Sequence, residues 1–458
     1  MPIDYIDRPL IRSAYSTNRF TFLDAEVSSV MANILAVDLI ENGDRSELEH
    51  WQRNQLTNLL RHAHARSGFW RARMPDRLIN AGIFERLPVL DRDQLASQVK
   101  AEGCLIANQL NSAFQTNRTS GSTGKPMEIY SSSENAYYNG LRTLAQYFIN
   151  GLSFDKNRTR ISLPRAPSEI LARKQKVELS EGWNGALGKL YRSGLSKTIT
   201  YAHDNDSLIK ELKRHPIGYF VSPARYLELL IDEGGYELIE ELKIKYWIHL
   251  SDYRNPELLN KLKPLGIICL SNYSADETGP IAYECKHQEG VYHIAHTNVL
   301  VEEDASVQVE SDGRKLSRLL VTHLHSYATP IIRYDIGDFG CVMDGCPCGH
   351  KGKVIAHIFG RGKHFLKCPN GKTIPFYISP RVLRNICEFI EYRIRQTAID
   401  TITLELCRKE ELKAEQIDRL VQVIKTASNE AFKVVIKATP EIDWSDNPKR
   451  LVFTSSFA

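Results

Sequence analysis

The sequence predicts an α/β protein, with a large N-terminal domain of mixed and parallel sheets with helices and a small α+β C-terminal domain. Two observations support this. Strand patterns alternate with helix patterns from about residue 216 to 270, which is typical of a sheet with parallel strands. After Gly360 the composition changes, and strand-like segments flank one helix. Because 458 residues exceed one ordinary hydrophobic core, we expect domains at 1–360 and 361–458.

Residues 1–45 carry no motif, and the first expected element is a helix at about 46–66. A turn after this helix leads to Asp91, which could cap the next helix. Residues 114–150 hold a glycine-rich loop, a short strand and a helix, whereas 155–215 are polar and lysine-rich without strong periodicity. Within the helix expected at about 46–66, apolar side chains recur at helical spacing: Leu56, Leu59, Leu60 and Ala63.

After residue 216, strands and helices alternate. We expect strands at 217–221, 245–250 and 266–270, and helices at 224–231 and 256–262.

The rest of the chain is rich in strand patterns. Residues 291–340 contain several, including a buried-strand candidate at 319–322. Near the end, strand-like segments at 401–407 and 432–436 flank a helical pattern at 413–428. This order predicts the small α+β domain.

The composition excludes several classes of protein. The net charge of +4 is spread along the chain, which argues against a nucleic-acid binder. No apolar run approaches the ~20 residues needed to cross a bilayer, and the start MPIDYIDRPLIRSAY lacks the apolar core of a signal peptide. We therefore expect a cytoplasmic protein that binds neither nucleic acid nor membrane, and a homodimer is left open. Because cytosolic thiols stay reduced, the nine cysteines do not indicate disulfides.

A glycine-rich segment at 119–126 is the strongest local signal. Glycines let backbone amides turn toward an anion, hydroxyls add donors, and a lysine adds positive charge. It differs from a Walker A loop, because only two residues separate its glycines and a proline follows its lysine. An alternating strand pattern at 127–130 then predicts a phosphate loop between two strands, with an ordinary Ser/Gly turn as the alternative. The phosphate-binding residues are Thr119, Ser120, Gly121, Ser122, Thr123, Gly124 and Lys125.

The loop sequence TSGSTGKP resembles the phosphate loop of the adenylate-forming superfamily of acyl-CoA ligases, adenylation domains and luciferases. From about residue 50 to the end, the chain most resembles the phenylacetate–CoA ligase branch and its capsular-polysaccharide-type relatives. The segments SGFW at 67–70 and LPV at 87–89 resemble the N-terminal part of that branch. The resemblance implies ATP, an adenylate intermediate and a mobile C-terminal domain.

A second segment, SNYSADETGP at 271–280, resembles the family's Y-G-x-[ST]-E motif. The resemblance implies that Tyr273, with Asn272 beside it, lies against adenine and that Glu277 holds Mg²⁺. A carboxylate suits this role, because Mg²⁺ prefers one or two carboxylates together with phosphate oxygens. The alternative for Glu277 is an ordinary surface acid.

A third segment, PIIRYDIGD at 330–338, resembles the family's P-x-x-R-Y-x-x-G-D. The resemblance makes Asp338 the acceptor of hydrogen bonds from the ribose hydroxyls, for which an ionised carboxylate is suited. Arg333 is as compatible with a structural ion pair as with a role in the site.

Two further segments resemble parts of the family that move. FGRGK at 359–363 resembles the G-R-x-D hinge, with Arg361 in place and Lys363 at the aspartate position. NPKR at 447–450 stands where the family has a lysine that bridges carboxylate and α-phosphate. Lys449 is the candidate, although the preceding glycine is missing, and a solvated lysine is the alternative. With Lys125 and Glu277, it completes the catalytic residues that the resemblance implies.

Cysteine and histidine residues near the centre of the chain suggest a second metal site. Three thiolates and one imidazole form a tetrahedral structural Zn²⁺ site of the Cys₃His kind. Some relatives in the phenylacetate–CoA ligase branch bind zinc through similar cysteines. His350 and Cys341 are alternative ligands, and reduced cysteines without metal are the other interpretation. The predicted ligands are Cys285, His293, Cys346 and Cys348.

The acid and its acceptor are less clear from the sequence. Relatives that use CoA often carry R-G-x-x-[IV] after the hinge, whereas KCPNGKTIP at 367–375 looks more like the turn of the capsular-polysaccharide-type group. HLSD at 249–252 replaces the usual small-x-Glu. An aromatic acid pocket at the strand ends is one interpretation, with core packing as the other. Its candidate residues are Tyr137, Tyr138, Trp247 and His249.

These features predict an ATP-dependent ligase that activates a small aryl acid as acyl-AMP, releases pyrophosphate and passes the acyl group to CoA. The chemistry is displacement at phosphorus, in which the protein positions groups and neutralises charge. One alternative acceptor is an amine, in an amide synthetase or in a nitrite-adenylating enzyme of secondary metabolism that acts on an aryl amine. A second alternative is that the protein is not a ligase but a catalytically silent nucleotide-binding scaffold. The departures from the family motifs at Ser274, Lys363 and Pro448 favour this alternative.

Overall fold

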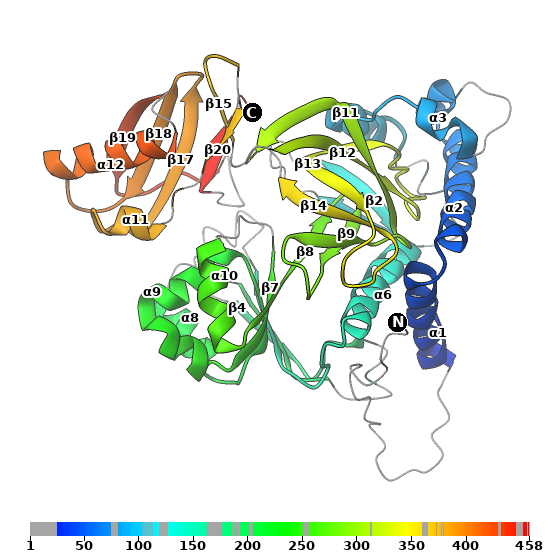
Figure 1. The fold of residues 1–458 in the computed structure, drawn as a ribbon, viewed down its shortest axis with the longest axis horizontal. Coiled ribbons are helices and arrows are strands. Elements are labelled where there is room, and N and C mark those ends of the chain that lie inside the picture. Colours follow the sequence, from blue (N-terminus) through cyan, green and yellow to red (C-terminus); the bar gives the residue numbers. More distant parts are fainter. Residues whose placement is uncertain are drawn as a thin grey trace, which may run out of the picture.

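The structure of the chain is a computed structural model, shown in Figure 1. The residues that it describes are 25–74, 81–103, 106, 108, 110, 113–118, 127–162, 176–185, 188, 193–200, 205–250, 256–311, 314–359, 365–371, 373–376, 378, 380–428, 432–445, 452–455 and 457.

The N-terminal part is helical. Helix α2 (Arg45–Arg66) begins at Asp44, whose side chain accepts a hydrogen bond from the Ser46 amide, and it buries the apolar face expected at 46–66. Asp91 caps α4 as predicted, in a reciprocal capping box with Gln94. The other helical segments here are α1 (Ala25–Asn42), α3 (Gly68–Arg73), η2 (Ala81–Arg86), α4 (Arg92–Gln98) and η3 (Val99–Gly103).

Within the described residues, twelve strands form one sheet in the order β11-β12-β13-β14-β10-β9-β8-β7-β6-β3-β5-β4. Strands β5, β3, β6, β7 and β8 are parallel to one another, which confirms the parallel sheet expected from the alternating pattern. From β8 to β11 the pairing is antiparallel. The strands are β3 (Arg158–Ser162), β4 (Lys176–Ser180), β5 (Ser196–Thr200), β6 (Gly218–Ser222), β7 (Ile244–His249), β8 (Ile268–Ala275), β9 (Gly279–Glu284), β10 (Val291–Ile294), β11 (Val299–Ser311), β12 (Arg314–His323), β13 (Tyr334–Asp344) and β14 (Lys353–Phe359).

Helices cover both faces of the parallel strands. Because side chains alternate along a strand, Phe220 and Trp247 pack under one helical layer, while Tyr219 and Tyr246 pack under the other. Figure 1 shows the two layers on opposite sides of β7. The first layer contains α8 (Asn205–Leu212), α9 (Ala224–Glu241), α10 (Pro256–Leu262) and η5 (Lys263–Leu265), and the second contains α1 and α6 (Ser133–Ile149).

A short hairpin flanks the predicted phosphate loop. Strand β1 (Phe114–Arg118) pairs antiparallel with β2 (Glu128–Ser132), so that Arg118 lies opposite Glu128. The loop residues 119–126 themselves lie outside the described residues. The expected arrangement of a strand on each side of the loop is therefore observed.

The C-terminal part is an α+β unit with its own core, at one side of the molecule in Figure 1. Its four-stranded sheet has the order β19-β18-β17-β20. The predicted boundary at 360/361 lies outside the described residues and stays a prediction. The elements are β15 (Phe365–Lys367), β16 (Thr373–Pro375), α11 (Pro380–Arg384), β17 (Glu391–Ala398), β18 (Thr401–Cys407), α12 (Ala414–Ala427), β19 (Lys433–Thr439) and β20 (Phe453–Ser455).

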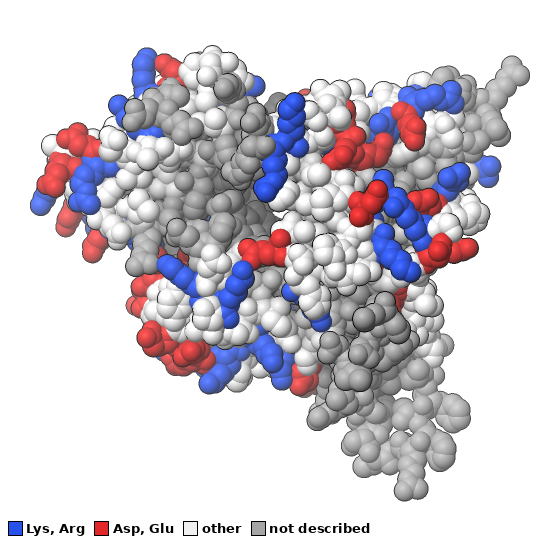
Figure 2. Space-filling model, in the orientation of Figure 1, with Lys and Arg blue, Asp and Glu red and all other residues white. Residues whose placement is uncertain are grey.

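On the face shown in Figure 2, Lys and Arg are intermixed with Asp and Glu. A search of the described helices finds none that is long and apolar enough to cross a bilayer.

Candidate functional site

Polar side chains lie side by side at the edge of the sheet where the parallel strands β6 and β7 end. Ser222 and His249 are the last residues of β6 and β7, and Ser271, the register partner of His249, lies within β8. His249 is buried, and its Nδ1 lies 3.4 Å from the Ser271 Oγ. Open α/β sheets bind ligands outside the carboxyl ends of their strands, so this edge is where a substrate would bind.

Trp247 packs in the core, next to Ser222 of that edge. Its ring is fully buried beneath α8, α9 and α10, and its indole Nε1 donates to the Ser222 Oγ at 3.2 Å. For Trp247 the structure therefore agrees with core packing, the alternative that the sequence left open. Of the four candidate residues for the acid pocket, only His249 ends a strand at this edge.

The two tyrosines of the candidate acid pocket lie on α6 and are partly exposed. Tyr138 stacks on His325, with ring centroids 4.7 Å apart, and the Tyr137 hydroxyl accepts a hydrogen bond from Asn33 at 3.3 Å. Both tyrosines thus contact elements other than the ends of the parallel strands.

The predicted adenine and ribose residues lie in contact. The Tyr273 hydroxyl, at the end of β8, donates to Asp338 Oδ2 on β13 at 2.7 Å. Asp338 is buried, Tyr273 is half-buried, and Asn272 lies beside it on β8 opposite Tyr283. This hydrogen bond joins two motifs that are separated by 65 residues. Their strands are not neighbours in the sheet, because β9, β10 and β14 lie between β8 and β13.

Glu277, the predicted magnesium ligand, is buried and paired. Its Oε1 lies 2.7 Å from the Arg92 guanidinium, and the Glu277 side chain is only 2% exposed. Gly279 follows with φ +65°, and a Cβ there would lie 2.6 Å from the Asn139 side chain, so the turn requires glycine. The surface-acid alternative is therefore wrong for Glu277.

Sequence reasoning missed Arg92. It is the first residue of α4, directly after the capping Asp91, and it lies outside all the segments that resemble the family. No signal in the sequence links it to Glu277, because 185 residues separate the two. The pair keeps a buried carboxylate compensated, which an isolated buried charge would not be.

Arg333 makes structural contacts. It has a left-handed backbone with φ +49°, and its guanidinium pairs with Glu302 at 3.2 Å. The same guanidinium donates to the carbonyl oxygens of Glu85 and Leu87. It therefore joins the η2 segment to the sheet.

Several predicted site residues lie outside the described residues. They include the whole phosphate loop with Lys125, the hinge residues Arg361 and Lys363, and the candidate lysine Lys449 with its neighbour Pro448. Their roles stay predictions.

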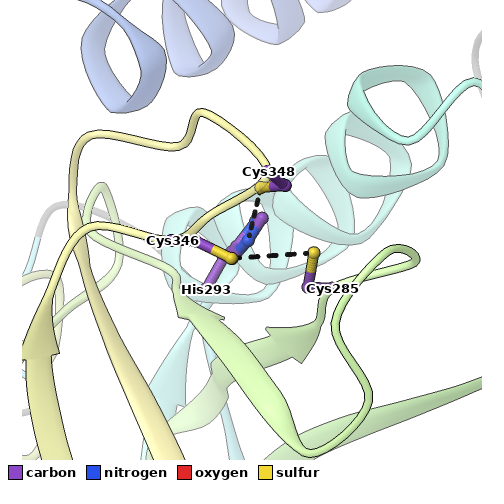
Figure 3. Close-up of side chains that lie close together, drawn as sticks. All are labelled: Cys285, His293, Cys346 and Cys348. Carbon is purple, nitrogen blue, oxygen red and sulfur yellow. Dashed lines mark hydrogen bonds between the residues drawn. The ribbon is translucent and has the colours of Figure 1, made fainter.

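The cysteine and histidine side chains predicted to bind zinc converge (Figure 3). Cys285 follows β9, His293 lies on β10, and Cys346 and Cys348 lie in the loop between β13 and β14. One potential ligand atom from each of the four lies within 4.8 Å of the others. We call these four residues the Cys/His cluster.

The spacing of these atoms fits a tetrahedral metal ion. The Sγ atoms of Cys346 and Cys285 are 3.9 Å apart, and Cys348 Sγ lies 3.4 Å from His293 Nε2. Two ligand atoms bound tetrahedrally to one Zn²⁺ at ordinary bond lengths lie about 3.5–3.8 Å apart. The cluster therefore fits Zn²⁺ with little movement.

Burial sets the protonation of the cluster. It lowers the pKa of His293 to about 3, with His350 as the next cause, so this imidazole is neutral and can act as a ligand. Burial also raises the pKa of the Cys285 and Cys346 thiols. A metal ion would have to displace the protons of these thiols.

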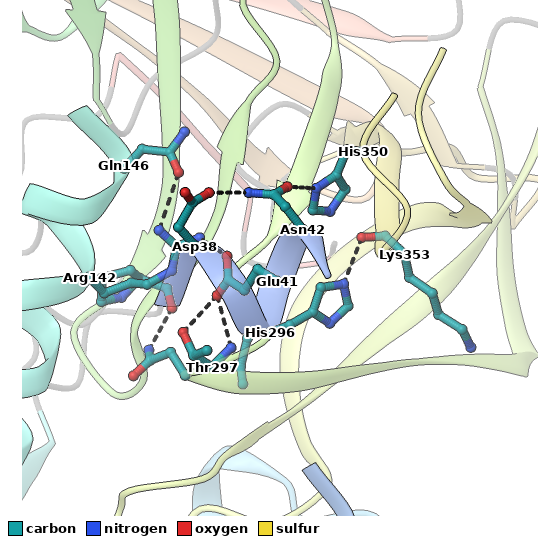
Figure 4. A network of polar contacts seen from close by, with 12 residues as sticks. Asp38, Glu41, Asn42, Arg142, Gln146, His296, Thr297, His350 and Lys353 are labelled. Atoms are coloured by element: carbon teal, nitrogen blue, oxygen red, sulfur yellow. Dashed lines mark hydrogen bonds and ion pairs between the residues drawn. The ribbon is translucent and has the colours of Figure 1, made fainter. Parts of the chain in front are cut away.

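A polar network behind the cluster holds helix α1 (Figure 4). Asn42 donates to Asp38 at 2.8 Å and, through its Oδ1, lies 3.0 Å from His350 Nδ1. His350 stacks on His293 with ring centroids 4.2 Å apart. His350 therefore packs against the candidate ligand His293 and is not itself one of the four cluster residues, and the other alternative ligand, Cys341, is not among them either.

A second contact in the same network fixes α1 to α6. Glu41 and Arg142 form a buried ion pair at 2.5 Å, and Glu41 also accepts from the Thr297 amide at 2.9 Å. Sequence reasoning missed this network, because its residues come from four separate parts of the chain.

The comparisons with known proteins concern the fold. No protein-family model and no curated protein matches this sequence. Among solved structures, 2-hydroxyisobutyryl-CoA ligase in the postadenylation state with 2-HIB-AMP aligns with a TM-score of 0.59 at 15% identity, covering 88% of this chain and 89% of that one. The same ligase with 2-HIB-AMP and CoA in the thioesterification state aligns with a TM-score of 0.55 at 16% identity, covering 91% and 92%.

At such low identity, the likeness concerns the fold. It extends over nearly the full length of both chains, including the C-terminal part. The fold class expected from the sequence is therefore confirmed, and the chain shares the fold of 2-hydroxyisobutyryl-CoA ligase.

Proposed function

We propose that this protein is an ATP-dependent adenylate-forming ligase, which activates a small carboxylic acid as acyl-AMP and transfers the acyl group to CoA. The observation that carries the proposal is the hydrogen bond between Tyr273 on β8 and Asp338 on β13. The buried Glu277 lies in the turn that directly follows β8. Two motifs that resemble the adenine and ribose segments of the family thus meet in the fold of such a ligase.

In this proposal, each residue has a defined task. Asp338 accepts hydrogen bonds from the ribose hydroxyls, and the Tyr273 ring lies against adenine. Lys125 and the amides of the 119–126 loop neutralise the phosphates. Glu277 would hold Mg²⁺, which supplies further charge neutralisation at the phosphate oxygens.

The reaction follows from this arrangement. An oxygen of the acid forms a bond to the α-phosphorus, the bond from that phosphorus to the pyrophosphate oxygen breaks, and pyrophosphate leaves. Lys449 would stabilise the charge between carboxylate and α-phosphate. His249, at the edge of the parallel strands, is the described residue best placed to contact the acid.

The Cys/His cluster has a structural task in this proposal. Its four residues would hold Zn²⁺ with no position left for substrate, which is typical of structural sites. The ion would tie the turn after β9 to the loop before β14. A cytoplasmic location is consistent with this, because reduced thiols are needed to bind the metal.

One assay tests the activity. Pyrophosphate release and product formation with ATP are measured across a panel of aryl acids, 2-hydroxyisobutyrate and nitrite, each alone, with CoA and with an aryl amine. We expect release with at least one carboxylic acid and a thioester product when CoA is added. An absence of pyrophosphate release with every acid would contradict the proposed adenylate-forming activity. Product formation only with an amine would contradict the proposal that CoA is the acceptor.

A variant tests the phosphate loop. Lys125→Ala should lower pyrophosphate release about a hundredfold, because it removes a positive charge from the phosphates. Lys176→Ala, on the exposed strand β4, is the matched control. Full activity in Lys125→Ala would show that the loop has another role.

A further inference from the structure

A cavity of about 600 Å³ lies between helices α1, α2 and α6. Its walls include Val37 and Ile40 from α1, Trp51 from α2 and Leu141 from α6. Tyr273, Glu277 and Asp338 are not among its lining residues. Its volume is in the range of sites for small organic ligands.

Aromatic rings line the cavity in an ordered arrangement. Tyr138 and His325 stack with centroids 4.7 Å apart and an angle of 16° between the ring planes. The ring centroids of Trp51 and His325 are 6.3 Å apart. The Tyr327 ring packs edge-on against the His62 ring, with centroids 5.1 Å apart. Such walls suit a planar aromatic ligand, because offset and edge contacts between rings add to the gain from burial.

The wall of the cavity offers a hydrogen-bond acceptor, which belongs to His325. Its Nε2 lies 2.8 Å from the Thr297 carbonyl, so this nitrogen carries the proton and Nδ1 is left as an acceptor. Burial lowers the pKa of His325, which keeps the ring neutral. This acceptor in the wall favours a ligand that donates a hydrogen bond.

The charges at the cavity do not favour an anion. Among the described residues that line it, the cation is Arg142, whose guanidinium is already paired with Glu41 and bonded to Gln146. The other charged residue of this described lining, Glu134, is acidic. The described lining therefore offers a nucleotide or an acyl phosphate no unpaired positive charge.

We infer that this cavity binds a neutral aromatic molecule with an N–H or O–H donor, of the class of arylamines and phenols. The donor would bond to His325 Nδ1, and the ring would lie against Tyr138 and Trp51. This inference does not depend on the proposed function, because none of the residues involved belongs to the proposed nucleotide site.

Calorimetry on the full chain without ATP tests the inference. The ligands are p-toluidine and p-cresol, each compared with its methylated form, N,N-dimethyl-p-toluidine and 4-methylanisole. We expect the two donors to bind about tenfold more tightly than the methylated forms, which cannot donate a hydrogen bond. Whichever of the two donors binds more tightly distinguishes an amine site from a phenol site.

A pair of variants locates the site. Ala36→Trp fills the cavity from α1 and should weaken binding at least tenfold, whereas Ala32→Trp, on the exposed face of the same helix, should leave it unchanged. Thermal unfolding of both variants checks that they are folded. Absence of binding, equal affinity for the methylated ligands, or unaltered binding by a folded Ala36→Trp variant would each overturn the inference.

Discussion

The nucleotide-side residues and the Cys/His cluster differ in how their side chains are satisfied. Asp338 accepts from Tyr273, and Glu277 is paired with Arg92, so both carboxylates have protein partners. In the cluster, Cys346 and Cys285 face each other at 3.9 Å, and Cys348 faces His293 at 3.4 Å, with no carboxylate between them. The first group is charged and paired, whereas burial favours neutral thiols and a neutral imidazole in the second.

From this difference we expect the nucleotide-side residues to matter more for turnover and the Cys/His cluster to matter more for stability. A paired carboxylate can share or exchange its partner when a ligand arrives, so its loss should affect turnover more than folding. Converging neutral ligands gain their interaction only from a metal ion, so their loss should affect folding more than turnover. The following predictions test this contrast.

The largest effect is expected at Glu277. Glu277→Gln should lower ATP–pyrophosphate exchange about a thousandfold, because a neutral amide is a much weaker ligand for Mg²⁺. Asp276→Asn, the exposed neighbour in the same turn, is the matched control. The rate is measured at saturating Mg²⁺, and an activity within tenfold of the wild type would remove Glu277 from the site.

A smaller effect, on stability, is expected at the cluster. Cys346→Ser should release the zinc and lower the melting temperature by about 5 °C or more, because the four ligands join two separate loops. Cys341→Ser, a half-buried thiol on the neighbouring strand, should keep the metal. Metal analysis and thermal unfolding measure both quantities. Freshly purified wild-type protein without zinc would contradict the assignment.

His323 is a buried histidine that belongs neither to the nucleotide-side residues nor to the Cys/His cluster. It therefore tests the effect of burial on stability without a candidate metal ligand. Burial lowers the pKa of His323 to about 3, so below pH 6.5 the unfolded imidazole takes a proton that the folded one does not. Stability should therefore fall as the pH falls from 7 to 5. His323→Phe should remove about 2 kcal/mol of this loss in urea unfolding. An identical pH dependence in the variant would show that other groups cause the acid sensitivity.

The smallest effect is expected at Tyr273. Tyr273→Phe keeps the ring but removes the hydroxyl that bonds to Asp338, so the KM for ATP should rise about threefold to tenfold. Little change is expected in kcat or in thermal stability. An unchanged KM would indicate that this hydrogen bond does not position the ribose acceptor.

Much of the fold could be predicted from periodicity. The helix at 46–66, the cap at Asp91 and the alternating strands and helices after residue 216 all depend on local spacing, and the structure has each of them. The helix at 224–231 is longer than predicted, because α9 continues to Glu241 through Gly235, which has a non-helical backbone. The stretch at 155–215, which had no strong periodicity, supplies β3, β4 and β5 of the main sheet.

The candidate site could be predicted only in part. Motif order identified Tyr273, Glu277 and Asp338, and residue type identified the four cluster residues. The contact of Arg92 with Glu277 could not be predicted, because nothing in the local sequence of α4 depends on a residue 185 positions away. Trp247 was ambiguous for a related reason, since an aromatic residue on a buried strand suits a pocket and a core equally well.

By itself, the sequence determined the elements, their order and the chemistry that each motif can supply, because these depend on residue type and on spacing along the chain. Only the tertiary structure decided which groups meet: Tyr273 with Asp338, Glu277 with Arg92, and His293 with three cysteines. The same is true of the cavity beside His325, which is formed by helices from distant parts of the chain. Such contacts arise from packing across the sheet, and packing brings together residues whose separation in sequence carries no information about their distance in space.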